Sequence, residues 1–151
     1  MNVLGLMSGT SMDGLDACLA NLEINKNNKL ILHSNKFEFI PFSNNLKSKI
    51  YDAVQYQEPS NIKELHEEIG LFLLESTKGL LKNEQIDLIS MHGQTISHIN
   101  GEKTIQIGNP KYLYDSYHIP IIYDFRSFDI KLGGNGAPLM PFLDWMLYKK
   151  S

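Results

Sequence analysis

The N-terminal segment Met1–Asp16 constrains the fold of this chain more than any other stretch. An apolar run from Val3 to Met7 leads into a turn rich in glycine, hydroxyl side chains and aspartate, and a second apolar run begins at Leu15. This pattern predicts a strand, a tight turn and a second strand. Because glycine has no Cβ, the turn backbone can approach a ligand closely, and successive turn amides form a concavity for anions such as phosphate. A β-hairpin with an ordinary polar turn is the alternative interpretation.

The acidic residues of this turn add a second kind of chemistry. Asp13 and Asp16 cannot bind phosphate directly, but carboxylates can hold Mg²⁺ or its water ligands, which in turn bind phosphate. The turn is not a P-loop, because no lysine follows its glycines.

The rest of the chain predicts one domain, an α/β domain with a mixed sheet in which three antiparallel strands precede alternating helices and strands. The expected strands are Val3–Ser8, Leu15–Glu23, Lys29–Ile40, the buried runs Ile86–Met91 and Ile119–Tyr123, and a hairpin of Ile96–Ile99 with Lys103–Ile107 around a type I′ turn at Asn100 and Gly101. The expected helices run from a Ser43 cap to about Gln55, from a cap at Ser60 or Asn61 to about Leu81, from Asn109 and Pro110 onward, and from about Pro138 to Lys149.

Charge and hydropathy narrow the class of protein. The formal net charge is −3 and the 14 lysines and arginines are scattered, which argues against a nucleic-acid surface. The N-terminus lacks the pattern of a signal peptide, and no apolar run approaches the ~20 residues of a membrane span. We therefore expect a cytoplasmic protein that binds neither nucleic acid nor membrane.

Polar residues follow both buried strands, where ligands sit in open α/β sheets. His92, Gln94 and Thr95 could bind sugar hydroxyls or a carboxylate, although a polar turn with a structural histidine fits equally well. After the second strand, Asp124 could act as a general base and Arg126 could clamp a phosphate or carboxylate, although an ion pair that orders the loop is the alternative.

A glycine-rich segment, Gly133–Leu139, precedes the last helix and offers backbone amides to an anion, or serves as a plain connector. We expect this loop and the two strand ends to converge on one cleft. The remaining histidines His33, His66 and His118 have no partner at metal-ligand spacing, so we interpret them as structural or surface residues, and we predict no metal centre built from protein side chains alone.

Several of these segments together resemble the anhydro-N-acetylmuramic acid kinases. The segments that carry the resemblance occur in the family's order: Gly5–Asp16, Ser90–Thr95, Gln106–Pro110, Tyr123–Arg126 and Gly133–Leu139. Two positions depart from the family pattern, which commonly has glutamine at Asn135 and a small residue at Tyr123. The resemblance implies the ribonuclease-H-like fold of the actin, acetate kinase and sugar kinase superfamily.

The resemblance also implies a reaction. Members of the family use ATP, with Mg²⁺, to phosphorylate 1,6-anhydro-N-acetylmuramic acid at its 6-oxygen while water opens the anhydro bridge, a step of peptidoglycan recycling. By position, Asp124 matches the catalytic base that activates this water. His92, Gln94, Thr95 and Arg126 lie where the cleft is lined, and we assign them to the substrate. The matches to the ATP phosphate-binding turn are Gly9, Thr10, Ser11, Met12, Asp13, Gly14, Leu15 and Asp16.

Length is the main departure from the family, whose members are about twice as long and carry a second domain. We therefore expect residues 1–151 to form a single N-terminal lobe whose partner lobe is missing from this chain, and to be inactive alone. The apolar surface left by a missing lobe favours self-association, for example as a homodimer. A non-catalytic module that binds muropeptide sugars or a protein is the alternative function, and a related kinase with another substrate is a third.

Overall fold

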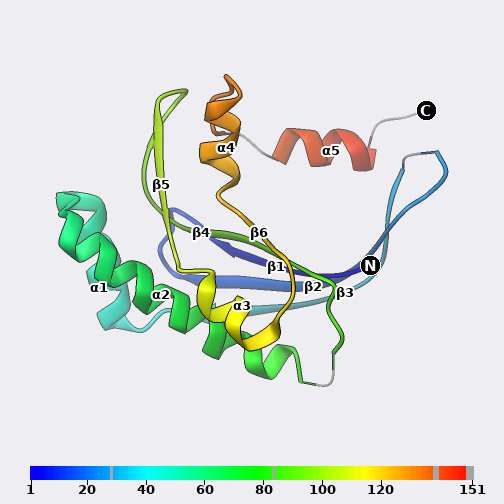
Figure 1. Cartoon of the computed structure of the whole chain (residues 1–151), viewed down its shortest axis with the longest axis horizontal. Helices are drawn as coiled ribbons and strands as arrows, with labels where there is room; N and C mark the ends of the chain where they lie inside the picture. The colour runs from blue at the N-terminus through cyan, green and yellow to red at the C-terminus, as the bar shows by residue number, and fades with distance from the viewer. Residues whose placement is uncertain (28, 83, 138–139, 149–151) are drawn as a thin grey trace.

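A computed structural model describes residues 1–27, 29–82, 84–137 and 140–148. Figure 1 shows a central sheet with helices α1 (Asn44–Tyr56), α2 (Pro59–Leu80) and α3 (Lys111–Tyr117) on one side. Helices α4 (Phe125–Lys131) and α5 (Met140–Tyr148) lie on the other side of the sheet. The predicted α/β class is therefore confirmed.

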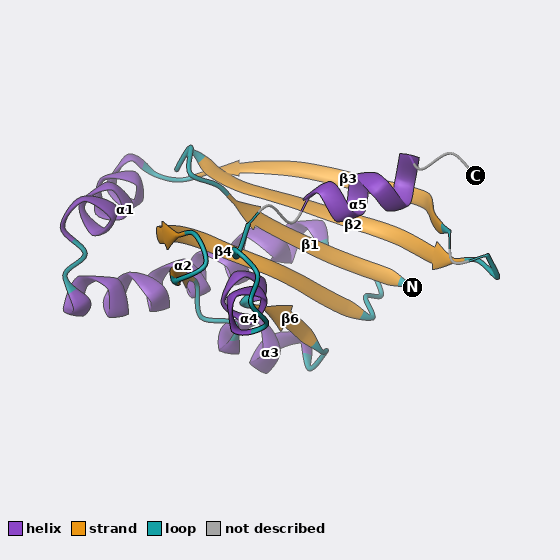
Figure 2. Cartoon of the chain, turned by 90° about the horizontal axis from the view of Figure 1, so that it is seen from above, coloured by secondary structure: helices purple, strands orange, loops and turns teal. Residues whose placement is uncertain are grey.

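The first three strands form the predicted antiparallel meander. They are β1 (Asn2–Ser8), β2 (Gly14–Ile24) and β3 (Leu30–Pro41), and each end lies within about two residues of the expected one. β2 pairs with β1 on one side and with β3 on the other, so β3 is an edge strand. Figure 2 shows the three strands side by side.

The later strands extend the sheet beyond β1. β4 (Leu88–Ile99) and β6 (Ile121–Tyr123) add in parallel, which gives the strand order β3-β2-β1-β4-β6 in this part of the sheet. The second half of β4 pairs instead with β5 (Lys103–Ile107), as the predicted hairpin requires. The carboxyl ends of β1, β4 and β6 therefore lie at the same edge of the sheet.

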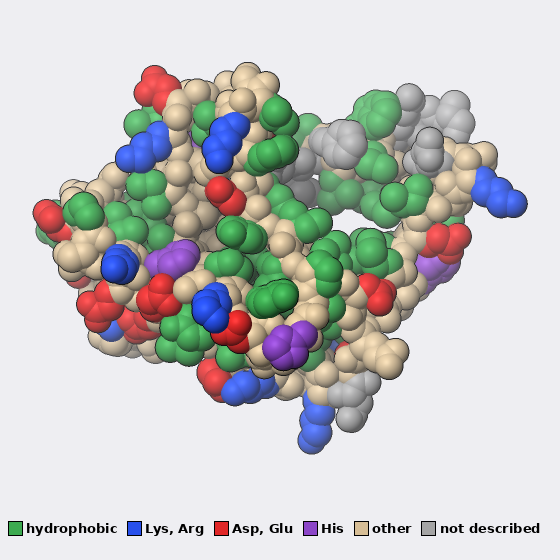
Figure 3. Space-filling view, in the orientation of Figure 1, with side chains coloured by type: hydrophobic (Ala, Val, Ile, Leu, Met, Phe, Trp, Pro, Cys, Tyr) green, Lys and Arg blue, Asp and Glu red, His purple; other side chains and the backbone are tan. Residues whose placement is uncertain are grey.

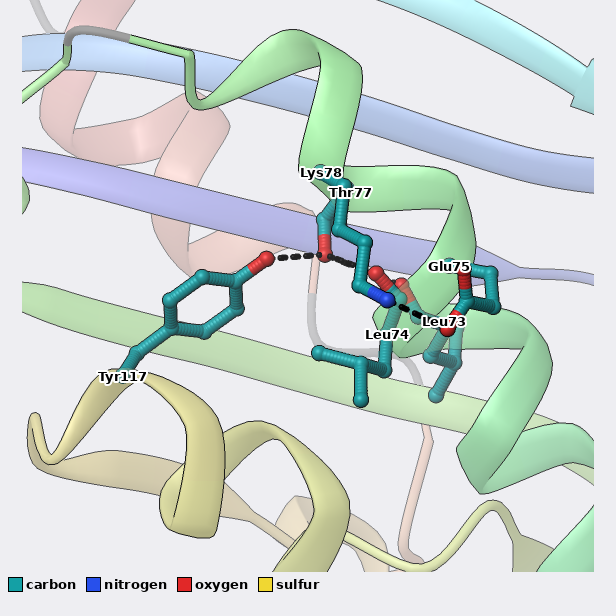
Figure 4. Close-up of polar contacts among 6 residues, drawn as sticks. All are labelled: Leu73, Leu74, Glu75, Thr77, Lys78 and Tyr117. Carbon is teal, nitrogen blue, oxygen red and sulfur yellow. Dashed lines mark hydrogen bonds and ion pairs between the residues drawn. The ribbon is translucent and has the colours of Figure 1, made fainter.

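The core lies between the sheet and the first three helices. Leu4, Leu15 and Ile89 are fully buried on the sheet face that α2 covers, and α2 contributes Leu65, Ile69, Leu73 and Leu80. At the far end of α2, the Thr77 hydroxyl group lies 3.1 Å from the Tyr117 hydroxyl group and within 3.0 Å of the Leu73 carbonyl oxygen (Figure 4). This buried polar contact ties α3 to α2.

Helix caps are confirmed in one case and corrected in another. Ser43 caps α1, because its side chain accepts a hydrogen bond from the Leu46 backbone N–H. The second helix begins at Pro59 rather than after Ser60 or Asn61, with Glu58 at the N-cap position. Proline is favoured in the first turn, where its missing N–H has no intrahelical partner to lose.

Two further predictions about local structure, the end of β4 and the type of the hairpin turn, are wrong. β4 does not end at Met91 but continues to Ile99, so His92 and Thr95 lie within a strand. The hairpin loop has three residues between paired Ile99 and Lys103, and only Gly101 in it has positive φ, so it is not a type I′ turn.

The strand β6 is shorter than predicted and its last two residues are exposed, because it pairs on one side only. Helix α4 was predicted as part of a loop. Pro138 and Lys149, the predicted ends of the last helix, lie outside the described residues, and within them the helix spans Met140–Tyr148.

Within the described residues, no helix is both long and apolar enough to cross a membrane. On the face shown in Figure 3, basic side chains lie scattered among acidic and apolar ones.

Candidate functional site

A cavity of about 280 Å³ lies where the second half of β4 meets β5, β6 and the start of α4. It brings together three of the sequence segments singled out above, together with one residue of α2. The residues that line it are His66, Met91, His92, Gly93, Thr104, Ile105, Gln106, Ile107, Gly108, Pro110, Tyr123, Asp124 and Ser127.

Asp124 lies at the junction of β6 and α4, on the cavity wall. Its backbone is left-handed (φ 59°, ψ 38°), a conformation that aspartate tolerates better than most residues. It holds the N-cap position of α4, yet its side chain makes no capping hydrogen bond. Among the described residues no group bonds to this carboxylate, so both of its oxygens can accept hydrogen bonds from a ligand in the cavity.

His92 faces Asp124's cavity from a bulge in β4. Between the pairs Leu6–Met91 and Ser8–Gln94, β4 has one more residue than β1, and Gly93 takes a positive φ of 75° there. A Cβ at Gly93 would lie 2.6 Å from the Ile107 carbonyl oxygen, so this close approach of β4 and β5 requires glycine.

The protonation of His92 follows from its two hydrogen bonds. The Nε of Arg126 donates to His92 Nε2 over 2.9 Å, so that ring nitrogen carries no proton. His92 Nδ1 therefore holds the proton and donates it to the Gly93 carbonyl oxygen, 2.9 Å away. Burial lowers the pKa of His92, and the nearby Arg126 charge lowers it further, so the ring is neutral at pH 7.

Arg126 connects β4 to the glycine-rich segment that follows α4. Besides its bond to His92, it donates from Nη1 to the Gly136 carbonyl oxygen over 3.0 Å. Asp129 holds the same segment through the Gly136 N–H (2.7 Å). There is no room for a Cβ at Gly134, which would lie 2.2 Å from the Asp129 carboxylate. Arg126 thus fixes His92 and the glycine-rich segment relative to each other.

The turn between β1 and β2 lies beside this site and is anchored by Gln94. Gln94 is fully buried; its Oε1 accepts from the Ser8 hydroxyl group, and its Nε2 donates to the Gly9 carbonyl oxygen over 3.0 Å. Thr10 and Ser11 are exposed, and Met12 takes a positive φ of 53°. The turn therefore presents exposed hydroxyl groups at the same sheet edge.

Asp13 is held ionised in this turn. The Ser11 hydroxyl group donates to Asp13 Oδ1 over 2.6 Å, and this bond lowers the pKa of the Asp13 carboxyl. Asp13 is exposed, so it is accessible to a cation that arrives with a ligand. Asp16 is also exposed but lies on β2, and the Leu15 side chain is buried in the core.

The structure thus separates the predicted site residues into groups. His92 and Asp124 share the cavity, with Arg126 behind His92. Gln94 does not line the cavity, and neither does Thr95, whose Oγ1 accepts a hydrogen bond from Gln106 over 3.4 Å. Pro138 and Leu139 of the predicted anion-binding loop lie outside the described residues.

Sequence reasoning missed His66, which it assigned to structure or surface. His66 lies on α2, more than twenty residues from any polar strand end, so no local motif marks it. The sequence also gave no role to Gln106 and Gly108, although both residues line the cavity. The fold brings them there because the β4–β5 hairpin folds back toward α2.

Comparisons with known proteins show which family this chain belongs to. The sequence pattern of the anhydro-N-acetylmuramic acid kinase family matches residues 1–151. An anhydro-N-acetylmuramic acid kinase of Bacillus cereus is 36% identical over an alignment of 166 residues, which covers 99% of this chain and 42% of the relative. A kinase of the same description from Bacillus thuringiensis subsp. konkukian is 36% identical over 165 residues, with the same shares of the two chains.

The solved structure of Thermus thermophilus RuvC covers 100% of this chain, and the match covers 84% of that chain, with a TM-score of 0.41 and 15% identity. Likeness at this level carries no conclusion about function. The chain spans about two fifths of the length of the curated kinases it matches. Since the family's pattern covers all 151 residues, the chain belongs to the anhydro-N-acetylmuramic acid kinase family.

Proposed function

We propose that this chain is the first lobe of a two-lobe cytoplasmic kinase that uses ATP to phosphorylate 1,6-anhydro-N-acetylmuramic acid at its 6-oxygen, with hydrolysis of the anhydro bridge. The observation that carries the proposal is the Asp124 carboxylate, which lines the cavity without an internal hydrogen-bond partner among the described residues. Family membership supplies the substrate class.

In this proposal Asp124 is the general base. A water molecule bound in the cavity gives a proton to the Asp124 carboxylate as its oxygen attacks the anomeric carbon of the sugar. The bond from that carbon to the bridging oxygen breaks, and the bridging oxygen remains on the sugar as the 6-oxygen, ready to accept the phosphoryl group. His92 is neutral, with both nitrogens bonded within the protein. Its role is to shape the cavity wall, and Arg126 holds it in place.

The turn Gly9–Asp16 is proposed to hold the phosphates. Its exposed hydroxyl groups and amides suit phosphate oxygens, and the ionised, exposed Asp13 suits a Mg²⁺ ion that arrives with ATP and keeps most of its water ligands. When bound, ATP would supply the phosphoryl group and Mg²⁺ would offset its negative charge. Gln94 supports the turn from the core.

The chain alone should turn over slowly at best. Two-lobe kinases close both lobes over their substrates and exclude water from the phosphoryl transfer. The matched relatives are more than twice as long as this chain, and we propose that the additional length forms the second lobe.

Release of ADP tests the proposal. We would measure it with 1,6-anhydro-N-acetylmuramic acid, ATP and Mg²⁺, on this chain and on the complete protein that the gene encodes. We expect sugar-dependent ADP release from the complete protein. If the complete protein binds the sugar but releases no ADP, the lobe is a non-catalytic binding module. If it instead phosphorylates another sugar or acetate, the substrate assignment is wrong.

A variant tests the role of Asp124. In the complete protein, Asp124→Asn should lower kcat by about 10²–10⁴-fold, because the amide cannot accept the proton of the attacking water. Asp115→Asn is the matched control, since Asp115 is exposed on α3, outside the cavity, and forms an ion pair with Lys111. Full activity of Asp124→Asn would contradict the proposed base.

A further inference from the structure

His66 lies between two adjoining cavities and lines both of them. It extends from α2, half-buried, and lines both the cavity described above and an adjoining one of about 540 Å³. Pro110 and Tyr123 also line both cavities. A ligand large enough to extend from one cavity into the other must therefore pass His66.

The side chain and backbone of His66 are both anchored to the segment after β5. The Gly108 N–H donates to His66 Nδ1 over 3.2 Å, and the Asn109 N–H donates to the His66 carbonyl oxygen over 2.9 Å. Gly108 has a positive φ of 121°, and a Cβ there would lie 3.1 Å from the Ile69 side chain and 3.3 Å from the Leu73 side chain of α2. The imidazole ring is therefore held at a fixed position.

These bonds also determine where the proton of the neutral ring lies. A backbone N–H can only donate, so Nδ1 of His66 must accept and carries no proton. The proton of the neutral imidazole is then on Nε2. To the residues that the structure describes, Nε2 makes no hydrogen bond. His66, which lines the cavity, thus has a positioned N–H donor without an acceptor among the described residues.

The other histidine of the cavity, His92, cannot donate a hydrogen bond to a ligand. Both ring nitrogens of His92 are already bonded, to Gly93 and to Arg126. Asp124 offers only acceptor oxygens when ionised. A sugar rich in hydroxyl, ether and carbonyl oxygens needs a donor as well as an acceptor, and His66 is a donor that the cavity can supply.

We infer that His66 is a substrate-contacting residue, which donates from Nε2 to an oxygen of the bound anhydro sugar. The identity of the sugar rests on the proposed function; the donor at Nε2 rests on the geometry alone. The contact forms on binding and takes no part in the proton transfer at Asp124. It should therefore lower KM without contributing to kcat.

Two substitutions separate this role from a purely structural one. In His66→Asn, the side-chain oxygen can still accept from the Gly108 N–H, but the donor toward the cavity is lost. In His66→Gln, the side-chain amide can place an N–H near the position of Nε2, but the anchor to Gly108 is lost. The two variants thus each keep one half of the histidine's function.

In the complete protein, we expect His66→Asn to raise KM for the anhydro sugar about 5–10-fold, the value of one neutral hydrogen bond, with kcat and the KM for ATP little changed. His66→Gln should stay within about threefold of the unsubstituted protein. The inference is overturned if His66→Asn binds the sugar normally, or if His66→Gln is the weaker binder of the two. If the unsubstituted complete protein has no activity on the sugar, the proposed function is wrong. The contact between His66 and this sugar is then wrong as well.

A measurement on the unsubstituted chain covers the case in which the variants do not fold. Nitrogen chemical shifts of His66 should show the proton on Nε2 at pH 8, and addition of the anhydro sugar to the complete protein should shift the Nε2 resonance. A proton on Nδ1, or an Nε2 resonance that does not respond to saturating sugar, overturns the inference.

Discussion

At the scale of single residues, the site depends on which side-chain atoms are already bonded within the protein. His92 bonds through both nitrogens, Gln94 through both ends of its amide, and Asp124 through neither carboxylate oxygen among the described residues. A buried polar group without a partner is costly in free energy, so the bonded side chains stabilise the fold. The half-buried carboxylate of Asp124, by contrast, stays available to a ligand.

The neutral state of His92 predicts how stability depends on pH. Burial, aided by Arg126, lowers the pKa of His92 in the folded protein below the value near 6.5 expected in the unfolded chain. As pH falls through about 6.5, the unfolded chain binds a proton that the folded protein does not, so the free energy of unfolding decreases. The contribution is fully present above pH 6.5 and is lost toward acid.

Urea denaturation of the chain between pH 5 and 8 measures this effect. We expect His92→Gln, which keeps an acceptor for Arg126 but does not titrate, to show a smaller loss of stability between pH 6.5 and 5. Parallel pH profiles of the variant and the unsubstituted chain would show that His92 titrates normally.

At the scale of elements, β4 decides where the site lies. Its first half pairs with β1 and β6, and its second half pairs with β5. The bulge at His92 and Gly93 marks the change of partner and turns His92 into the cavity. Gly93 permits this because its φ is positive and because a Cβ at this position would lie 2.6 Å from the Ile107 carbonyl oxygen, which leaves no place for a side chain.

Alanine substitutions at two glycines test this account. Gly93→Ala should lower the free energy of unfolding by about 2–4 kcal/mol, because the positive φ and the overlap with β5 both oppose a Cβ. Gly79→Ala should instead raise it by about 0.5–1 kcal/mol, because Gly79 lies in α2 with open space around its Cβ position. Equal effects of the two substitutions on urea denaturation would contradict a special role for Gly93.

At the scale of the whole molecule, the two faces of the sheet differ. Helices α1–α3 cover one face, whereas the other carries a row of paired residues that runs across the strands. Phe37 pairs with Cys18, Cys18 with Gly5, Gly5 with Ser90, and Ser90 with Ile122. Phe37 is 63% exposed at one end of this row, and Ile122 is 49% exposed at the other. Exposed apolar surface of this kind favours association.

Sedimentation velocity over a range of concentrations should therefore show that chain 1–151 self-associates. Phe37→Lys should move the transition to at least about tenfold higher concentration, because burial of one large apolar side chain contributes about 1.5–3 kcal/mol. Leu71→Lys is the control, because Leu71 is exposed on α2, on the other side of the sheet. A chain that stays monomeric throughout, or one that responds equally to both substitutions, would contradict this expectation.

The sequence by itself determined the three-stranded meander, the α/β class and the position of two polar strand ends at one sheet edge. These features follow from local patterns, because alternation, caps and turn residues act over a few positions and parallel strands share a carboxyl edge. The same patterns identified Asp124 and His92 as cavity residues in advance, although their roles in the reaction stay predictions.

Only the tertiary structure decided which of these side chains are available to a ligand. The extension of β4 past Met91 and the formation of α4 depend on pairing with β5 and on packing, which the local sequence does not record. The sequence of α2 predicts only an amphipathic helix and gives no sign that His66 lines a site. His66 lies at the site because the β4–β5 hairpin brings Gly108 next to α2. Contacts between residues far apart in the chain determine which polar atoms are bonded within the protein, and so which of them can bind a substrate.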